Sequence, residues 1–467
     1  MARKTIFPMT RAHEPIRVDV EVAGGRVTDA WISSHLYRGW EQMMIGRDVR
    51  DSILFTQRIC GICSSAHAVA GSLALQQATG LAPTVNGQHL TNLILAADTI
   101  QNHLRHFYLL TLPDYAAGPD TPPWTPRPAK PDLRLPPKAN AALVEHLPTA
   151  IRIAAAAHEL MAMFGAKAPH QQTIMVTGVT ERLDADKIKA ATALLREITY
   201  FVEGAHLPDV QTIAAHYPDY HTIGKGVGSF MSFGMFPEPH TGLRALKAGV
   251  RFADGTAEEL DAAQISEDVL YGWYREGTGG RPDTESTVPD PDKPGAYSWT
   301  KAPRYRGLPC EGGPLPRGII NGDYRGKGTG VADRILARAQ ETLKFCRLAE
   351  DWLARLVPGQ PTLQPYTLPP RGEGVGLTDV MRGSLGHWLK FADGKISHHQ
   401  IITPTAWKFS PRDARGKRGT VEEALIGTPV ADEASMVEVG RVIRSFDPCF
   451  TCAVHVISAP GAKPLVF

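Results

Sequence analysis

Two Cys-x-x-Cys pairs stand near opposite ends of the chain. The first is Cys60 with Cys63, and the second is Cys449 with Cys452. Four thiolates form a soft ligand set that suits zinc, nickel or an iron–sulfur cluster. Zinc ribbons usually place their pairs about 15–20 residues apart, whereas nearly the whole chain separates these two. The spacing favours a catalytic or redox metal at the centre of a large fold, and a structural zinc site stays open as the alternative.

The residues after Asp447 predict how the second pair is held. Asp447 suits a helix N-cap, and Pro448 suits the first helical position. In a helix that begins at Pro448, Cys449, Cys452 and His455 share one face because they are three residues apart. The helix dipole would favour the thiolate form of both cysteines.

The composition is that of a soluble globular protein. The chain has 467 residues, of which 43% are hydrophobic and 21% are charged, and its net charge of +2 implies no general attraction to nucleic acid. The N-terminus lacks the apolar segment of a secretory signal, and no apolar run reaches the roughly 18–20 residues of a membrane span. We expect a cytoplasmic protein, or one that is attached to a membrane through a partner.

Hydrophobic periodicity predicts an α+β fold that is predominantly helical. A β-hairpin is expected at 16–32, with its turn at Gly24-Gly25. Irregular structure is expected at 113–137 and 275–328, which are rich in Pro and Gly. Short strands are expected near 386–391 and 395–402. Helices are expected at 64–80, 88–110, 138–165, 184–204, 329–357 and 419–426.

The cysteine pairs and their neighbours resemble the paired signatures of the nickel–iron hydrogenase large subunit. The matching residues include Arg58 and His67 around the first pair, and Asp447 and His455 around the second. Further similar motifs are Tyr37-Arg-Gly-Trp-Glu41, His103-Leu-Arg-His-Phe-Tyr108, Ser298-Trp-Thr-Lys-Ala-Pro-Arg-Tyr305, Arg382-Gly-Ser-Leu-Gly-His-Trp388 and Thr403-Pro-Thr-Ala-Trp407. The resemblance implies a single intertwined domain over 1–455, with a central bundle of long helices and small peripheral β-sheets.

The resemblance also implies a binuclear metal centre. Cys60, Cys63, Cys449 and Cys452 would bind Ni, and Cys63 and Cys452 would bridge to an Fe that carries one CO and two cyanide ligands. H2 would be split heterolytically, as H2 ⇌ 2 H⁺ + 2 e⁻. The chain has no further cysteine cluster, so electrons would leave through a small subunit that carries Fe–S clusters.

Polar residues are implied around this centre. By resemblance, Arg382 lies over the metals as a base or electrostatic partner, and Asp447 holds it by a charge-assisted bond. Thr405 would contact a cyanide, although a simple turn residue after Pro404 fits nearly as well. His67 would be hydrogen-bonded toward a cysteine sulfur, and a buried core histidine is an equal alternative.

A magnesium site is implied beside the centre. Its ligands would be Glu41, the backbone carbonyl of Ile401, and His455, and waters would complete the shell, as is usual for Mg²⁺. A solvated glutamate is the alternative for Glu41. Residues 456–467 resemble the extension that a maturation protease removes after nickel-insertion factors have acted.

The sequence departs from the family pattern at several positions. The family's glutamate, thought to relay protons, is His13 here, and Glu14 replaces a glycine. Histidine can shuttle protons near neutral pH, so His13 or Glu14 is the expected relay; the alternative is that neither reaches the site. Asn102 replaces an aspartate near Arg382, and Met381 replaces a proline. These changes suggest a divergent branch.

Two other functions are alternatives to a metabolic hydrogenase. An H2-sensing regulatory subunit would share the centre, but such relatives tend to lack a C-terminal extension. A structural subunit of a respiratory complex, metal-free or with zinc, is opposed by the presence of all four cysteines.

Overall fold

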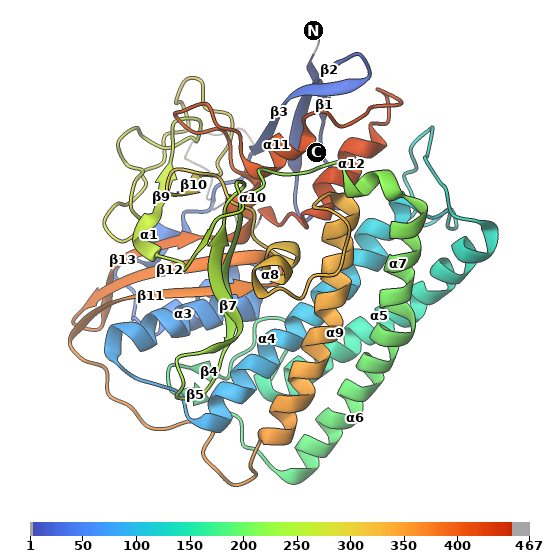
Figure 1. Ribbon diagram of the computed structural model, residues 1–467. Helices are drawn as coiled ribbons and strands as arrows, with labels where there is room; N and C mark the ends of the chain where they lie inside the picture. Colours follow the sequence, from blue (N-terminus) through green and yellow to red (C-terminus); the bar gives the residue numbers. More distant parts are fainter. Residues whose placement is uncertain (1–2, 451–467) are drawn as a thin grey trace.

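The computed structural model describes residues 3–450 of the chain. Long helices group on one side, and strands with long loops lie on the other (Figure 1). Helices account for 40% of the chain and strands for 20%, which confirms the α+β class. These shares do not confirm that the fold is predominantly helical. Within the described part, no helix is both long and apolar enough to cross a membrane.

Five long helices form the helical side, and α4 lies among them. The side chains of α4 from Asn86 to Leu104 are buried. Because no face of α4 meets solvent over this stretch, it lies at the centre of the packing, against α5 and α9. The helices are α4 (Val85–Arg105), α5 (Pro137–Gly165), α6 (Ala185–Phe201), α7 (Leu207–His216) and α9 (Val331–Arg355).

A three-stranded antiparallel sheet lies on the other side of the molecule from the long helices and carries Arg382 in one of its turns. It consists of β11 (Arg371–Val380), β12 (Gly383–Ala392) and β13 (Lys395–Ile402). Helix α3 (Ser64–Thr79) lies directly on β11. It ends at Gly80, a left-handed residue with φ of 70°, as predicted.

Glycines on β11 permit the close approach of α3. A Cβ at Gly376 would lie 1.9 Å from the carbonyl oxygen of Ala70, and one at Gly372 would lie 2.4 Å from that of Ala78. Strand and helix therefore run in opposite directions. It follows that the end of β11, where the hairpin turns toward β12, lies beside the N-terminus of α3 and so beside Cys63.

The predicted N-terminal hairpin is present. Strands β2 (Ile16–Ala23) and β3 (Arg26–Ser34) pair antiparallel, and Gly24 and Gly25 have φ of 58° and 70°, as the tight turn requires. Strand β1 (Arg3–Ile6) completes this sheet.

Shorter elements fill the remainder. The 275–328 stretch was predicted to be irregular throughout, and this is wrong, because it contains β10 and α8. Buried residues of both elements anchor them among the loops. The elements not yet given are α1 (Trp40–Met44), α2 (Asp51–Leu54), β4 (Ile174–Met175), β5 (Gly178–Val179), β6 (Phe230–Pro237), β7 (Arg244–Arg251), β8 (Ala257–Glu258), β9 (Ile265–Asp268), β10 (Ala302–Tyr305), α8 (Pro314–Asn321), α10 (Pro404–Phe409), α11 (Thr420–Leu425) and α12 (Val437–Ser445).

A buried glutamate joins the N-terminal hairpin to the C-terminal part of the chain. Glu422 on α11 accepts hydrogen bonds from the backbone N–H of Ile32 (3.0 Å) and the hydroxyl of Tyr297 (2.8 Å). Burial raises its pKa from an ordinary 4.5 to about 7. At neutral pH this carboxyl is therefore about half protonated in the folded chain.

The raised pKa of Glu422 predicts a pH-dependent stability. Between pH 4.5 and 7 the unfolded chain loses this proton while the folded chain keeps it. The free energy of unfolding should therefore fall by about 3 kcal/mol as the pH rises through this range. Glu422→Gln should remove that fall. Thermal unfolding of the purified protein at pH 5 and 7.5 measures it, and identical profiles for both proteins would contradict the assignment.

Candidate metal centre

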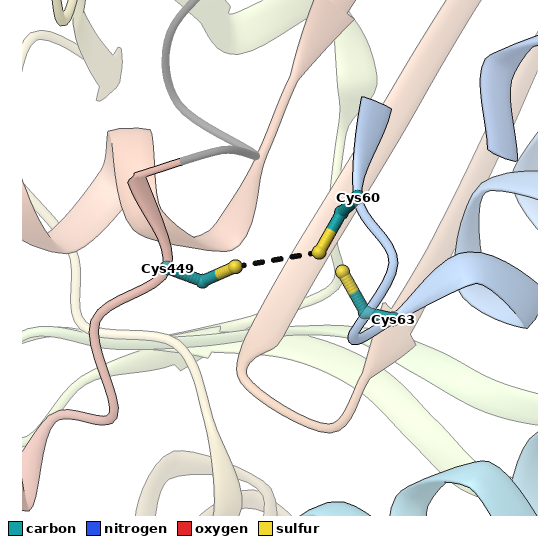
Figure 2. A group of neighbouring side chains, drawn as sticks. All are labelled: Cys60, Cys63 and Cys449. Carbon is teal, nitrogen blue, oxygen red and sulfur yellow. Dashed lines mark hydrogen bonds between the residues drawn. The ribbon is translucent and has the colours of Figure 1, made fainter. Parts of the chain in front are cut away.

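Three cysteines from two distant segments converge in the interior. Cys60 follows a short helical turn, Thr56–Ile59, and Cys63 is the N-cap residue of α3. Figure 2 shows their sulfurs directed toward that of Cys449. The three Sγ atoms lie within 4.8 Å of one another, and those of Cys60 and Cys449 are 3.4 Å apart. The predicted meeting of the two pairs is thus confirmed for these three cysteines.

The spacing of these sulfurs fits a common metal ion. Two sulfurs that each lie about 2.3 Å from one tetrahedral ion are roughly 3.8 Å apart, close to the separations found here. All three side chains are buried, so an ion would be shielded from water. Cys452 lies outside the described residues.

The predicted helix does not begin at Pro448, since neither Pro448 nor Cys449 is helical, so this part of the prediction is wrong; Cys452 and His455 lie outside the described residues. Asp447 has φ of 52°, and Cys449 forms a parallel β-bridge with His13. The N–H of Phe450 donates to the carbonyl of His13 at 3.2 Å. The backbone around Cys449 is therefore held by the N-terminal segment. At Cys449, pairing with His13 replaces the expected helical hydrogen bonding.

Arg382 faces the cysteine cluster from the hairpin between β11 and β12. Its side chain is 2% exposed, and its Nε lies 3.2 Å from Oδ1 of Asp447. Burial alone would lower its pKa, but the charges of Asp447 and of the three cysteines raise it well above the ordinary value. The guanidinium therefore stays protonated, which favours an electrostatic role over that of a base.

One donor of Arg382 is directed at no neighbour. Its Nη1 is buried and lacks a hydrogen-bond partner among residues 3–450. A buried donor without an acceptor is costly, so this nitrogen fits an anionic or polar ligand of a bound metal. This observation, together with the three sulfurs, shows that the side chains fit the implied centre.

Asn102 joins the two members of the ion pair. Its carbonyl oxygen accepts from Arg382 and, at 3.2 Å, from Arg105, and its amide nitrogen donates to Oδ2 of Asp447 at 2.9 Å. An ionised aspartate could not donate to Asp447. The replacement noted in the sequence therefore lies beside Arg382, as expected, and it adds a hydrogen bond to the pair.

His13, Thr405 and His67 are all near the centre. The Oγ of Thr405 accepts from the backbone N–H of Cys449 at 3.2 Å, so it holds a cysteine in place. Nδ1 of His67 lies 3.1 Å from Nε2 of His387, and burial lowers the pKa of His67 to about 3. Burial, followed by the charge of Arg382, lowers the pKa of His13 to about 4, so both imidazoles are neutral at pH 7.

Glu41 contacts Ile401, its predicted neighbour in the magnesium site, through the backbone N–H and not through the predicted carbonyl. Oε1 of Glu41 accepts from the backbone N–H of Ile401 (3.0 Å) and from Nζ of Lys301 (2.8 Å). Lys301 also contacts the buried carboxylate of Glu267. The solvated alternative for Glu41 is wrong, because its carboxylate is 13% exposed and paired. His455 lies outside the described residues.

Two buried basic side chains next to the site, Arg317 and Lys408, have no role assigned from the sequence, although Arg317 ends the family-like motif Gly313-Pro-Leu-Pro-Arg317. Arg317 and Lys408 donate to backbone carbonyls around Arg382. Lys408 directly follows the Thr403–Trp407 motif in the sequence. This position is the only sign in the sequence that Lys408 lies near the site. The hydrogen bonds of Lys408 are to main-chain atoms, so no complementary residue type in the sequence marks it. Arg317 pairs in addition with Glu341 and Asp379.

The family model for nickel-dependent hydrogenases matches this chain at residues 38–118, 122–330 and 325–455. Among curated proteins, the periplasmic [NiFeSe] hydrogenase large subunit of Desulfomicrobium baculatum is 39% identical, over 97% of this chain and 95% of the relative. The hydrogenase-2 large chain of Escherichia coli K12 is 29% identical, over 98% of both.

Solved structures agree with these matches. The D. baculatum [NiFeSe] hydrogenase superposes with a TM-score of 0.93 at 38% identity, covering 97% of this chain and 100% of that one. The enzyme from Desulfovibrio vulgaris Hildenborough gives 0.94 at the same identity and coverage. Although these relatives are named for selenium, cysteine occupies all four predicted ligand positions here. The chain therefore belongs to the nickel-dependent hydrogenases, oxidoreductases that act on H2, and is a large subunit of that family.

Proposed function

We propose that Cys60, Cys63, Cys449 and Cys452 hold nickel, and that Cys63 and Cys452 also bridge to an iron that carries one CO and two cyanides. The convergence of three buried sulfurs beneath Arg382 carries this proposal. Such a centre supplies the heterolytic cleavage of H2 into two protons and two electrons. Membership of the nickel-dependent family and the soft thiolate set both support it.

The surrounding side chains can stabilise negative charge on the thiolates and on the ligands of the metals. Arg382 places a permanent positive charge beside the thiolates, and its Nη1 is available to donate to a cyanide. Asp447 and Asn102 fix the orientation of the guanidinium. The hydroxyl of Thr405 accepts from Cys449, which leaves its hydrogen to donate to a second diatomic ligand. Donors fixed in a dry site need no reorganisation during the reaction.

His13 and Glu14 are the proposed first proton carriers. His13 is paired through its backbone with Cys449, and no partner for its buried Nε2 is found within residues 3–450. A neutral imidazole can accept a proton at one nitrogen and release one from the other. The low pKa of His13 suits brief occupation by a proton rather than storage.

Removing the proton carrier should slow turnover. If His13 is the relay, His13→Asn should lower the rate of H2/D⁺ exchange about 100-fold, a typical contribution of general acid–base catalysis. If the relay is Glu14, Glu14→Gln should do so instead. His35→Asn is the control, because His35 lies elsewhere in the N-terminal region. Full exchange activity in both variants would show that protons leave by another route.

Glu41, the carbonyl of Ile401 and His455 are the proposed magnesium ligands. The carboxylates of Glu41 and Glu267, which both contact Lys301, support an oxygen-rich site. Removal of residues 456–467 by a maturation protease, after insertion factors deliver nickel, is proposed from the family resemblance alone.

The proposed partner is a small subunit with Fe–S clusters, which would carry the electrons. Large-subunit relatives pair with a small subunit. An H2-sensing role is the second candidate, and the extension beyond His455 disfavours it. Intact mass of the mature protein separates the two: loss of the last twelve residues supports the enzyme, and retention supports the sensor.

Metal analysis with infrared spectroscopy tests the proposed centre. The purified protein should contain one nickel per chain and should show one CO and two cyanide stretching bands. Zinc without these bands would overturn the proposal. Magnesium content in the same sample tests the Glu41 site.

A further inference from the structure

The hairpin tip that carries Arg382 is held by two buried basic side chains. Arg317 donates to the carbonyl of Val380 at 2.8 Å and to that of Met381 at 3.4 Å. Lys408 donates to the carbonyl of Arg382 itself at 2.8 Å. Three consecutive carbonyls at the tip therefore accept hydrogen bonds from side chains of other elements.

Lys408 differs from Arg317 because it reaches a second segment. Its Nζ also donates to the carbonyl of Phe446 at 2.5 Å, and Phe446 directly precedes Asp447. The amino group of Lys408 thus binds the backbone of the two segments that supply Arg382 and Asp447. Arg317 is engaged instead by both carboxylate oxygens of Glu341, at 2.7 and 2.6 Å, and by Asp379.

The position of Lys408 is costly, which argues for a specific role. Its side chain is 2% exposed, and burial lowers its pKa to about 7. No hydrogen bond from Nζ to a carboxylate is found among the described residues. The amino group keeps at least two N–H donors in either protonation state, so both carbonyl bonds persist across neutral pH.

We infer that Lys408 is a positioning residue, which fixes the hairpin tip against the segment before the second cysteine pair and so sets where Arg382 stands over the metals. This inference rests on the proposed function. Among residues 3–450, Lys408 makes no hydrogen bond to a cysteine or to a predicted metal ligand. An error of about 1 Å in the position of a group that acts on the reacting atoms can cost roughly 100-fold in rate.

Infrared bands and kinetics of the assembled hydrogenase test the inference. Lys408→Met keeps the aliphatic stem but removes both hydrogen bonds. We expect nickel content to be retained, the cyanide bands to shift and the turnover number to fall at least about tenfold, because Arg382 is displaced from the diatomic ligands. Unchanged bands together with unchanged turnover would overturn the role.

The chain offers a matched control. Lys293 is also largely buried, and its Nζ donates to the carbonyls of Val269 (2.6 Å) and Tyr274 (3.0 Å), in a loop region that does not contribute the cysteines. Lys293→Met should leave bands and turnover at wild-type values. Equal losses in both variants would show that any buried lysine matters only for stability, and would overturn the inference.

A second variant covers loss of folding or metal loading. Lys408→Gln retains two N–H donors on a shorter side chain, so one carbonyl bond can be kept. A band shift smaller than that of Lys408→Met supports the role. If Lys408→Met does not load metal, any band shift in Lys408→Gln supports the role. Wild-type bands together with wild-type turnover in Lys408→Gln overturn it. Wild-type protein without CO and cyanide bands would instead overturn the proposed function, and this inference with it.

Discussion

Arg382→Lys is expected to lower the turnover number for H2 about 100-fold or more while nickel and iron contents stay at wild-type levels. The guanidinium contacts Asp447 and Asn102, and its buried Nη1 has no hydrogen-bond partner among residues 3–450. A lysine ammonium is a point charge on a flexible stem and cannot reproduce this planar arrangement. Losing one preorganised donor typically costs 100- to 1,000-fold in rate.

Turnover and metal content of the purified complex measure this effect. Arg304→Lys is a matched control, because Arg304 is also buried and pairs with an aspartate, Asp413, at 2.8 Å. The control should keep wild-type turnover per nickel. If Arg382→Lys did the same, charge alone would account for the function of Arg382.

Cys449→Ser is expected to abolish H2 oxidation and to reduce nickel content at least about tenfold. A serine hydroxyl is a hard ligand that stays protonated at neutral pH, whereas nickel in this centre requires soft thiolates. The loss also removes the sulfur that lies 3.4 Å from Cys60. Elemental analysis and an H2-dependent dye reduction assay test both parts.

Cys346→Ala is the control for the cysteine variant. Cys346 is buried in α9, and burial raises its pKa to about 12, so it remains a thiol and cannot supply a thiolate. This variant should keep wild-type nickel and activity. Full nickel content in Cys449→Ser would contradict the ligand assignment.

Much of the fold could be predicted because its signals are local. The periodicity of α3 and its stop at Gly80 depend on neighbouring residues alone, as does the Gly24-Gly25 turn. The glycines of β11 predict nothing by themselves, because the close approach that requires them involves α3, which is distant in sequence. Helix α8 was missed within a stretch of Gly and Pro, since its anchoring is tertiary.

The site, like the fold, has parts that the sequence predicts and parts that it does not. The convergence of the cysteine pairs followed from residue type, spacing and family motifs. The helix expected at Pro448 failed because pairing of Cys449 with His13 overrides the local preference of Asp-Pro. Lys408 could not be assigned from sequence, because its partners are the main-chain carbonyls of Arg382 and Phe446, which carry no residue signature.

The bridge between His13 and Cys449 has a consequence for synthesis. A ribosome makes the N-terminal strand and the first cysteine pair long before the segment that pairs with His13, because several hundred residues separate Cys63 from Cys449. Until that segment is made, a nascent chain therefore has only Cys60 and Cys63 of the cluster, and the segment that helps to bury them is absent. The three-cysteine cluster can therefore assemble only after Cys449 has been translated and has folded back onto the N-terminal strand.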